Sequence, residues 1–251
     1  MHTVTVVNNK GGVGKSAVTF ELASALTRLG KKVLCIDLDE QSTISIQALK
    51  TLDGYSIFDV IAKNCSIKES IKQTNNFDII MGDDKTRSLD KVLTEADDMF
   101  ILSDLLEEIN NDYDYCFIDN PAHLGACAYL AMIASSSGGV LIPVEPDVST
   151  IKGAVNVNDF IGRIKRFKPE LNIVGLIKIK FRNYNFHKAT TELLEKISKR
   201  IECKIFDTNI RECTALRESR GEQMSIFDYK PKSNAAIDFM EFAKEFDNIY
   251  K

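Results

Sequence analysis

The stretch NNKGGVGKSAV, residues 8–18, constrains the fold of this chain more than any other part of the sequence. It follows the apolar run TVTVV and leads into a segment with helical periodicity, residues 16–30. In a strand, glycine loop and helix arrangement, the loop N–H groups and the helix N-terminus surround a phosphate group. Lys15 would then reach the β- and γ-phosphates, and the Ser16 hydroxyl would ligate Mg²⁺. The stretch therefore predicts a phosphate-binding loop.

Two features of this loop depart from the strict phosphate-loop pattern. Asn9 stands where that pattern has glycine, and Lys10 adds a second lysine ahead of the glycines. Because Lys10 lies where the loop leaves the strand, its side chain could point away from the phosphates of its own loop. Taken alone, Lys10 is either a solvated loop lysine or an added cation for phosphoryl transfer, which spreads negative charge that a cation stabilises.

Five apolar runs alternate with segments of helical periodicity, which predicts buried parallel strands separated by helices. The predicted strands cover residues 3–7, 32–39, 114–121, 138–146 and 171–181, and the predicted helices cover residues 16–30, 99–110 and 187–201. We therefore expect an α/β fold in which a mostly parallel twisted sheet is covered by helices on both faces, as one domain over residues 1–251. Residues 40–98 are polar and irregular, and we expect only short helices there.

Three carboxylates follow two of the predicted strands. Asp37 and Asp39 are two residues apart, so they share one face of an extended strand, and Asp119 ends the run at 114–121. Ligands of such folds bind at the carboxyl ends of the strands. Taken alone, Asp37 and Asp39 could instead cap the following loop, whereas Asp119 has the layout of an aspartate that holds Mg²⁺.

The loop with its early lysine resembles the deviant Walker A motif, KGGxGK[ST], of the ParA/MinD family of P-loop ATPases. The resemblance runs from residue 3 to about residue 246 and is most specific over the first 45 residues. It implies a P-loop NTPase fold, ATP and Mg²⁺ as cofactors, and a homodimer that closes around two nucleotides. In such a dimer, Lys10 would contact the phosphates held by the partner subunit. The implied nucleotide-binding residues are Lys10, Gly11, Gly12, Val13, Gly14, Lys15, Ser16 and Ala17.

Two further segments resemble the switch motifs of the same family. Residues 37–41, DLDEQ, resemble the DxDxQ segment, which implies that Asp39 positions the attacking water and that Asp37 lies close to Mg²⁺. Residues 119–125, DNPAHLG, resemble DxPPxLG, but Ala122 replaces the second proline and does not fix φ as proline would. The resemblance therefore implies Lys10, Lys15 and Asp39 as catalytic residues, and Ser16, Asp37 and Asp119 as metal ligands.

Positive charge is concentrated in one part of a chain whose net charge is −4. Residues 178–220 hold eleven Lys or Arg against six Asp or Glu, so any surface for a polyanion would be local. ParA-like proteins bind DNA non-specifically in the ATP state through basic residues of this region, and a solvated basic face is the alternative. The candidate DNA contacts are Lys180, Arg182, Arg211, Arg217 and Arg220.

Nothing in the sequence favours a membrane partner. No apolar run approaches the 18–20 residues that span a bilayer. The tail at residues 236–251 is amphipathic but carries four acidic residues against two lysines, so anionic lipid would repel it. We expect that tail to form a helix packed on the domain. The six cysteines form no CxxC pair, which favours reduced thiols in the cytoplasm.

The resemblance implies a partition protein that hydrolyses ATP, weakly without a partner. It would form a nucleotide-sandwich dimer, bind DNA on the nucleoid in the ATP state, and segregate a plasmid or chromosome with a ParB-like, centromere-bound protein. The alternative within the family is a MinD-like ATPase that positions a membrane or protein complex. A metal-cluster carrier is a third possibility, which the missing CxxC pair disfavours.

Overall fold

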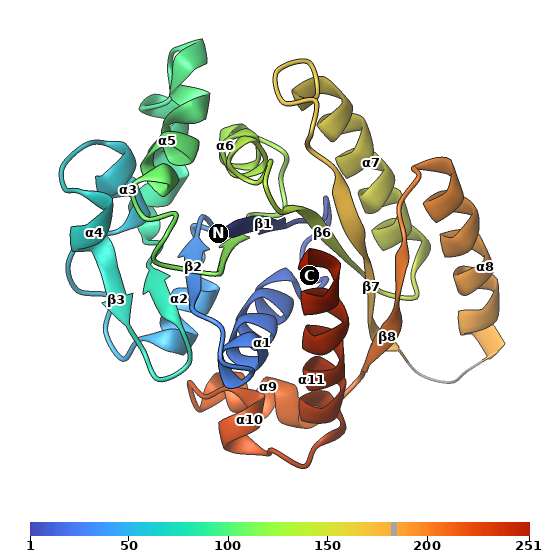
Figure 1. The fold of residues 1–251 in the computed structure, drawn as a ribbon. Helices are drawn as coiled ribbons and strands as arrows, with labels where there is room; N and C mark the ends of the chain where they lie inside the picture. Colours follow the sequence, from blue (N-terminus) through green and yellow to red (C-terminus); the bar gives the residue numbers. More distant parts are fainter. Residues whose placement is uncertain (182–184) are drawn as a thin grey trace.

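The computed structural model describes residues 1–181 and 185–251, and its described strands form a single sheet (Figure 1). The strand order is β3-β4-β2-β5-β1-β6-β7-β8, and every neighbouring pair is parallel except β3 and β4. This is the mostly parallel sheet that the sequence predicts. The strands are β1 (His2–Val6), β2 (Val33–Asp37), β3 (Ile71–Gln73), β4 (Asp78–Ile80), β5 (Tyr115–Asp119), β6 (Gly139–Val144), β7 (Ile173–Phe181) and β8 (Ile205–Arg211).

The central strands are apolar on both faces because helices cover both sides of the sheet. Along β2, Cys35 packs into the core on one face while Leu34 and Ile36 pack into the core on the other. Along β5, Phe117 and Ile118 divide in the same way. Such near-continuous apolar runs are typical of parallel strands buried on both faces.

The helices form two layers, which lie below and above the sheet in Figure 1. One layer contains α1 (Lys15–Arg28), α2 (Thr43–Ala48) and α11 (Asn234–Asp247), with α9 (Thr214–Gly221) and α10 (Ile226–Tyr229) at its edge. The other layer contains α3 (Ile57–Ile61), α5 (Ile101–Glu107), α6 (Ala126–Ala134), α7 (Val148–Ile164) and α8 (Asn185–Arg200). The short helix α4 (Ile67–Ser70) precedes β3, and 3₁₀ turns cover Asp84–Lys91, Ala96–Phe100 and Asn248–Tyr250.

Helix α1 covers most of the predicted segment 16–30, begins one residue earlier and ends at Arg28. Gly30 has φ +84°, and its N–H donates to the Thr27 carbonyl while the Lys31 N–H donates to the Leu26 carbonyl. These two bonds satisfy the last carbonyls of the helix in a Schellman motif, which favours glycine because of the positive φ. The tail is also confirmed as a packed helix, since Phe239, Phe242 and Phe246 of α11 are buried against the sheet.

The structure differs from the sequence-based expectations in two regions. Residues 40–98 contain the short strands β3 and β4 in addition to short helices, because β4 pairs with β2 at the edge of the sheet. Residues 205–211 form the edge strand β8, which is not among the predicted strands, and Arg211 is the last residue of that strand. Short edge strands with mixed polarity carry too little periodicity to be separated from loops. None of the described helices is both long and apolar enough to span a bilayer.

Candidate functional site

The ends of three central strands bring the predicted site together. In the sheet register, Val6 of β1 pairs with Asp119 of β5, and Asp119 also pairs with Asp37 of β2. The loop that follows β1 therefore starts beside both carboxylates. This adjacency follows from the strand order, because β5 lies between β1 and β2.

The glycine loop leads from β1 into α1 with the backbone that a phosphate loop requires. Gly12 and Gly14 have φ of +74° and +82°, a left-handed conformation that residues with a side chain rarely adopt. A Cβ at Gly14 would also lie 2.8 Å from Ile179 Cδ1. Glycine at this position therefore lets the loop pack directly against the end of β7.

The two lysines of the loop occupy different environments. Lys15 is buried, and its ammonium donates to the Lys10 carbonyl at 3.3 Å. Burial lowers the pKa of Lys15, while the nearby Asp119 and Asp39 carboxylates oppose that shift. The Lys10 side chain is partly exposed, and its ammonium lies 3.6 Å from the Asp147 carboxylate at the start of α7.

Asn9 replaces the glycine of the strict pattern and links the loop to two other segments. Its amide donates to the Ala122 carbonyl at 3.1 Å, and its side-chain oxygen accepts from Asn156 Nδ2 at 2.9 Å. Ala122 belongs to the loop after β5 that resembles a switch segment, and Asn156 belongs to α7. Asn9 therefore ties the phosphate loop to the loop in which alanine replaces the expected proline.

Asp37 is fully buried and organises the segment that follows β2. Its Oδ1 accepts from the Asp39 N–H at 3.1 Å, and its Oδ2 accepts from the Ser45 N–H and hydroxyl at 3.0 and 2.7 Å. Burial raises the pKa of Asp37, while these hydrogen bonds oppose that shift. Both oxygens are thus occupied in positioning Asp39 and α2, and the predicted contact of Asp37 with a metal ion remains a prediction.

Asp119 has an unused oxygen that fits a metal ion. The Thr19 hydroxyl lies 3.3 Å from Oδ1, whereas the buried Oδ2 has no hydrogen-bond partner among the described residues. Burial and the Asp37 carboxylate raise the pKa of Asp119, and the nearness of Ser16 and Lys15 opposes this. Such a buried oxygen is costly without a partner, and a cation beside Ser16 would supply one.

Among the described residues, no group of three or more His, Cys, Asp or Glu side chains could hold a metal ion. A Mg²⁺ site of the phosphate-loop kind needs no such group, because one or two side chains and the phosphates themselves bind the ion. All six cysteines are free thiols.

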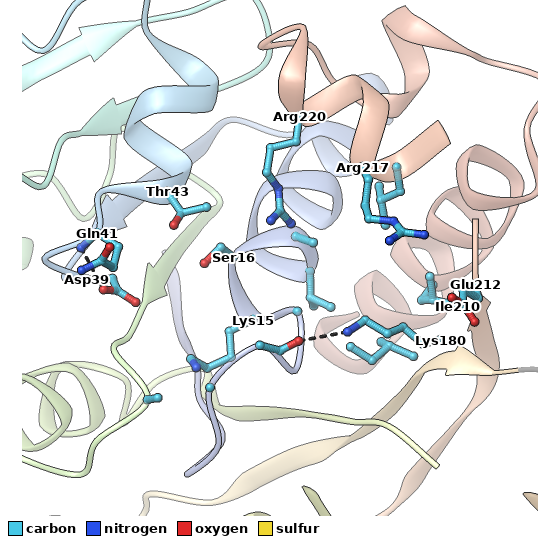
Figure 2. A pocket seen from close by; sticks show the side chains of 18 of the residues that line it. Lys15, Ser16, Asp39, Gln41, Thr43, Lys180, Ile210, Glu212, Arg217 and Arg220 are labelled. Carbon is cyan, nitrogen blue, oxygen red and sulfur yellow. Dashed lines mark hydrogen bonds between the residues drawn. The ribbon is translucent and has the colours of Figure 1, made fainter. Parts of the chain in front are cut away.

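A hollow of about 630 Å³ lies over the phosphate loop, and Figure 2 shows the side chains around it. Its size is within the range of small-molecule sites. The predicted residues that line it are Gly11, Gly12, Gly14, Lys15, Ser16, Ala17, Asp39, Lys180, Arg211, Arg217 and Arg220. Lys10, Val13, Asp37 and Asp119 are not part of the lining, and the Val13 side chain packs in the core.

Two of the predicted DNA contacts are held by carboxylates. The Lys180 ammonium lies 2.6 Å from Glu145 Oε1 and 3.0 Å from the Gly12 carbonyl, at a residue with φ +53°. Arg211 makes a two-pronged ion pair with Asp238 of α11, at 2.6 to 3.1 Å. Their binding to DNA remains a prediction, and Arg182 lies outside the described residues.

Arg217 and Arg220 lie on α9, which faces the phosphate loop across the hollow (Figure 2). The sequence reasoning missed the carboxylates that hold Lys10, Lys180 and Arg211, because each comes from a distant segment. The sequence does contain a local signal for one of these carboxylates, Asp147. Asp147 precedes a helical segment and caps α7 by accepting from the Ser149 N–H at 2.5 Å, which is a typical helix start.

Comparisons with known proteins find a family and relatives for this chain. A family model described as an AAA domain matches residues 1–173. The chain is 27% identical to the virulence plasmid ParA family protein pGP5-D of Chlamydia psittaci, over 99% of this chain and 95% of that protein. It is also 27% identical to the sporulation initiation inhibitor protein Soj of Bacillus subtilis, over 96% of each chain.

Solved structures share the fold over almost the whole chain. Cobyrinic acid a,c-diamide synthase from Mycobacterium smegmatis, with bound ATP analog and magnesium, superposes with a TM-score of 0.86 at 21% identity and covers all of this chain and 96% of its own. The septum site-determining protein MinD from Pyrococcus horikoshii, complexed with Mg-ADP, gives a TM-score of 0.79 at 24% identity over 99% of this chain and 97% of its own. The chain belongs to the AAA domain family described by the matching model, and within it to the ParA/MinD-type P-loop ATPases.

Proposed function

We propose that this chain is a Mg²⁺-dependent partition ATPase that closes into a dimer around two ATP molecules. The nucleotide would occupy the hollow over the phosphate loop, with its phosphates against Gly11–Ser16. The relatives support this proposal, because two of them carry ParA or Soj names and two structural neighbours carry an adenine nucleotide and magnesium.

Each predicted residue has a defined part in this mechanism. Lys15 and the loop amides hold the β- and γ-phosphates, and Ser16 and the free oxygen of Asp119 hold the metal ion. When bound, Mg²⁺ neutralises charge on the phosphate oxygens. Asp39, which lines the hollow and is held by Asp37, orients the attacking water.

The position of Lys10 carries the proposal of a dimer. Lys15 lines the hollow, whereas Lys10 lies outside it and is held by Asp147. A lysine that lies beside the hollow of its own subunit without lining it can contact the nucleotide of a second subunit when the two hollows face each other. There its charge would stabilise the charge that spreads over the transferred phosphoryl group.

The proposed dimer binds DNA non-specifically in the ATP state, and a ParB-like, centromere-bound protein stimulates hydrolysis and releases the DNA. Without that partner, turnover is weak. ATP binds the dimer better than the monomer, so hydrolysis shifts the population back to monomers. This cycle would place the protein in the cytoplasm on the nucleoid, where it would segregate a plasmid or a chromosome.

The second candidate is a MinD-like ATPase that organises a membrane or protein complex, which the fold of the Pyrococcus MinD structure favours. Co-sedimentation with duplex DNA and with vesicles of anionic lipid separates the two, in ATP, in ADP and without nucleotide. Retention on DNA in ATP alone supports the partition ATPase. Retention on vesicles alone supports the MinD-like function, and a chain that stays monomeric in ATP contradicts both.

A further inference from the structure

Two arginines of α9 project into the hollow without partners. Arg217 and Arg220 lie one turn apart on the helix and both line the hollow. The Arg220 side chain extends toward α1 and Ser16, and the Arg217 side chain lies on the side of Lys180 (Figure 2). Neither guanidinium has an ion pair or a side-chain hydrogen bond within the described part of the chain. Two arginines that form no ion pair among the described residues therefore line the hollow in addition to Lys15, and the carboxylates of Asp39, Glu40 and Glu212 line it as well.

The lining of the hollow has two chemically different parts. The phosphate loop and the segment after β2 supply backbone N–H groups and polar side chains. The other part, near α9, contains the apolar side chains of Ile179, Ile210, Leu216 and Phe239 beside the charged Lys180, Arg211 and Glu212. A nucleotide has the same division, because its phosphates are charged and its base is a flat, largely apolar ring. Phosphates on the loop would therefore place the base toward α9.

The helix is fixed over the hollow by hydrogen bonds to both neighbouring helices. Gln47 of α2 donates to the Met224 carbonyl, and Gln223 donates back to the Ile46 carbonyl of α2, each at 2.9 Å. The Ile226 N–H donates to both carboxylate oxygens of Glu21 on α1, at 3.1 Å. Because residues 223–226, directly after α9, are bonded to α2 and α1, the C-terminal end of α9 is fixed in place before a ligand enters.

We propose that Arg217 and Arg220 bind the nucleoside side and α-phosphate of the nucleotide, a role that rests on the proposed ATPase function. A guanidinium group stacks on flat rings and donates hydrogen bonds to phosphate oxygens, so the two arginines suit this part of the ligand. A DNA duplex cannot enter a hollow of about 630 Å³. The arginines that point into it are therefore within reach of a mononucleotide bound there.

The test is the affinity for fluorescent ADP, measured by titration without DNA. ADP isolates this contact, because it lacks the γ-phosphate that would close the proposed dimer. Arg217→Ala and Arg220→Ala should each weaken ADP binding by about 3- to 30-fold. Arg200→Ala is the matched control, since Arg200 is an exposed arginine of α8 that does not line the hollow. It should bind ADP as the unaltered chain does.

Circular dichroism establishes that each variant is folded, and Arg217→Lys replaces Arg217→Ala if the alanine variant does not fold. The lysine variant keeps the charge but loses the flat group, so it should also bind ADP more weakly. ADP affinities of the folded variants within twofold of the unaltered chain overturn the inference, whether or not retention on DNA is lost. An unaltered chain that binds neither ADP nor ATP would instead contradict the proposed ATPase function.

Discussion

The Lys10 ammonium lies 3.6 Å from the Asp147 carboxylate, outside the hollow that Lys15 lines. Asp147 does not depend on Lys10 for its position, because it caps α7 through the Ser149 N–H and hydroxyl. Those bonds to Ser149 and the charge of Lys10 lower the pKa of Asp147, so it is ionised at neutral pH. In the proposed mechanism, Lys10 must leave Asp147 before it reaches a second nucleotide.

Asp147→Asn should therefore make the dimer form at lower concentrations of a non-hydrolysable ATP analogue. Asparagine retains the cap of α7 but removes the charge that competes for Lys10. Exposed ion pairs contribute about 0.2–1 kcal/mol, so the half-maximal concentration should fall by about 1.5- to 5-fold in sedimentation velocity.

Two controls make this result specific to Lys10. Glu145→Gln releases Lys180 and leaves the Lys10 contact intact, so it should not reproduce the shift. In a Lys10→Ala background, Asp147→Asn should have no effect. A shift of equal size in that background would contradict the role of Asp147 as the resting partner of Lys10.

Lys10→Ala should lower ATP turnover by at least about a hundredfold, because a cation that stabilises the transferred phosphoryl group is removed. Nucleotide binding should change little, since Lys15 and the loop amides remain. Lys15→Ala should lose both binding and turnover. Phosphate release is measured with saturating ATP, Mg²⁺ and duplex DNA.

A mixture of the two variants tests the action between subunits. A chain with Lys10→Ala keeps its own Lys15 and can receive Lys10 from a chain with Lys15→Ala. The mixture should therefore recover part of the activity that neither variant has alone. No recovery at protein concentrations where mixed dimers form would contradict action on the second nucleotide.

Glu21→Gln should change how stability depends on pH. Glu21 of α1 is 1% exposed, and burial raises its pKa to about 8 despite the Ile226 N–H and the charges of Arg28 and Arg220. Between about pH 4.5 and 8 the folded state holds this proton and the unfolded state does not. The free energy of unfolding therefore falls as pH rises, by up to about 1.4 kcal/mol per pH unit.

Glutamine stays neutral, so this contribution to the decrease of the free energy of unfolding with pH is missing from the variant. Urea unfolding at pH 5.5, 6.5 and 7.5 should show the stability of Glu21→Gln rising relative to the unaltered chain at each step. Asp37 and Asp119 also have raised pKa values, but their contribution is common to both chains and cancels in the comparison. A difference between the chains that is constant across this range would contradict the prediction.

Arg211→Ala should lower the melting temperature by about 2–8 °C, because Asp238 would lose the partner of a nearly buried carboxylate. The Asp238 side chain is 6% exposed and would keep only the Arg211 N–H and weaker neighbours. Asp238→Ala should lower the melting temperature by a similar amount, and it leaves the Arg211 side chain without its ion pair. The measurement is differential scanning calorimetry.

Retention on DNA then separates a structural from a DNA-binding role for Arg211. If the arginine serves only the ion pair, both variants should retain DNA as the unaltered chain does, well below their melting temperatures. Loss of retention in Arg211→Ala but not in Asp238→Ala would assign Arg211 to the DNA surface instead.

The sequence by itself determined the parts of the site that lie within one local segment. Residues 8–18 specify the loop because its glycines, its lysine and the helix that follows are contiguous. Asp37, Asp39 and Asp119 were predicted at the strand ends because parallel strands present their carboxyl ends at one edge. The core strands were also predicted from local sequence, because burial on both faces leaves a continuous apolar run.

Tertiary structure alone decided which partner each charged side chain has. Lys180 and Arg217 come from a basic region that suggests DNA, but the bulged end of β7 and the docking of α9 bring both to the hollow over the phosphate loop. Asp147 and Asp238 hold Lys10 and Arg211 from segments more than twenty-five residues away. The net charge of a sequence window does not say where each side chain points. An ion pair forms only when its two charged groups lie within a few ångströms, so only the folded chain establishes these pairs.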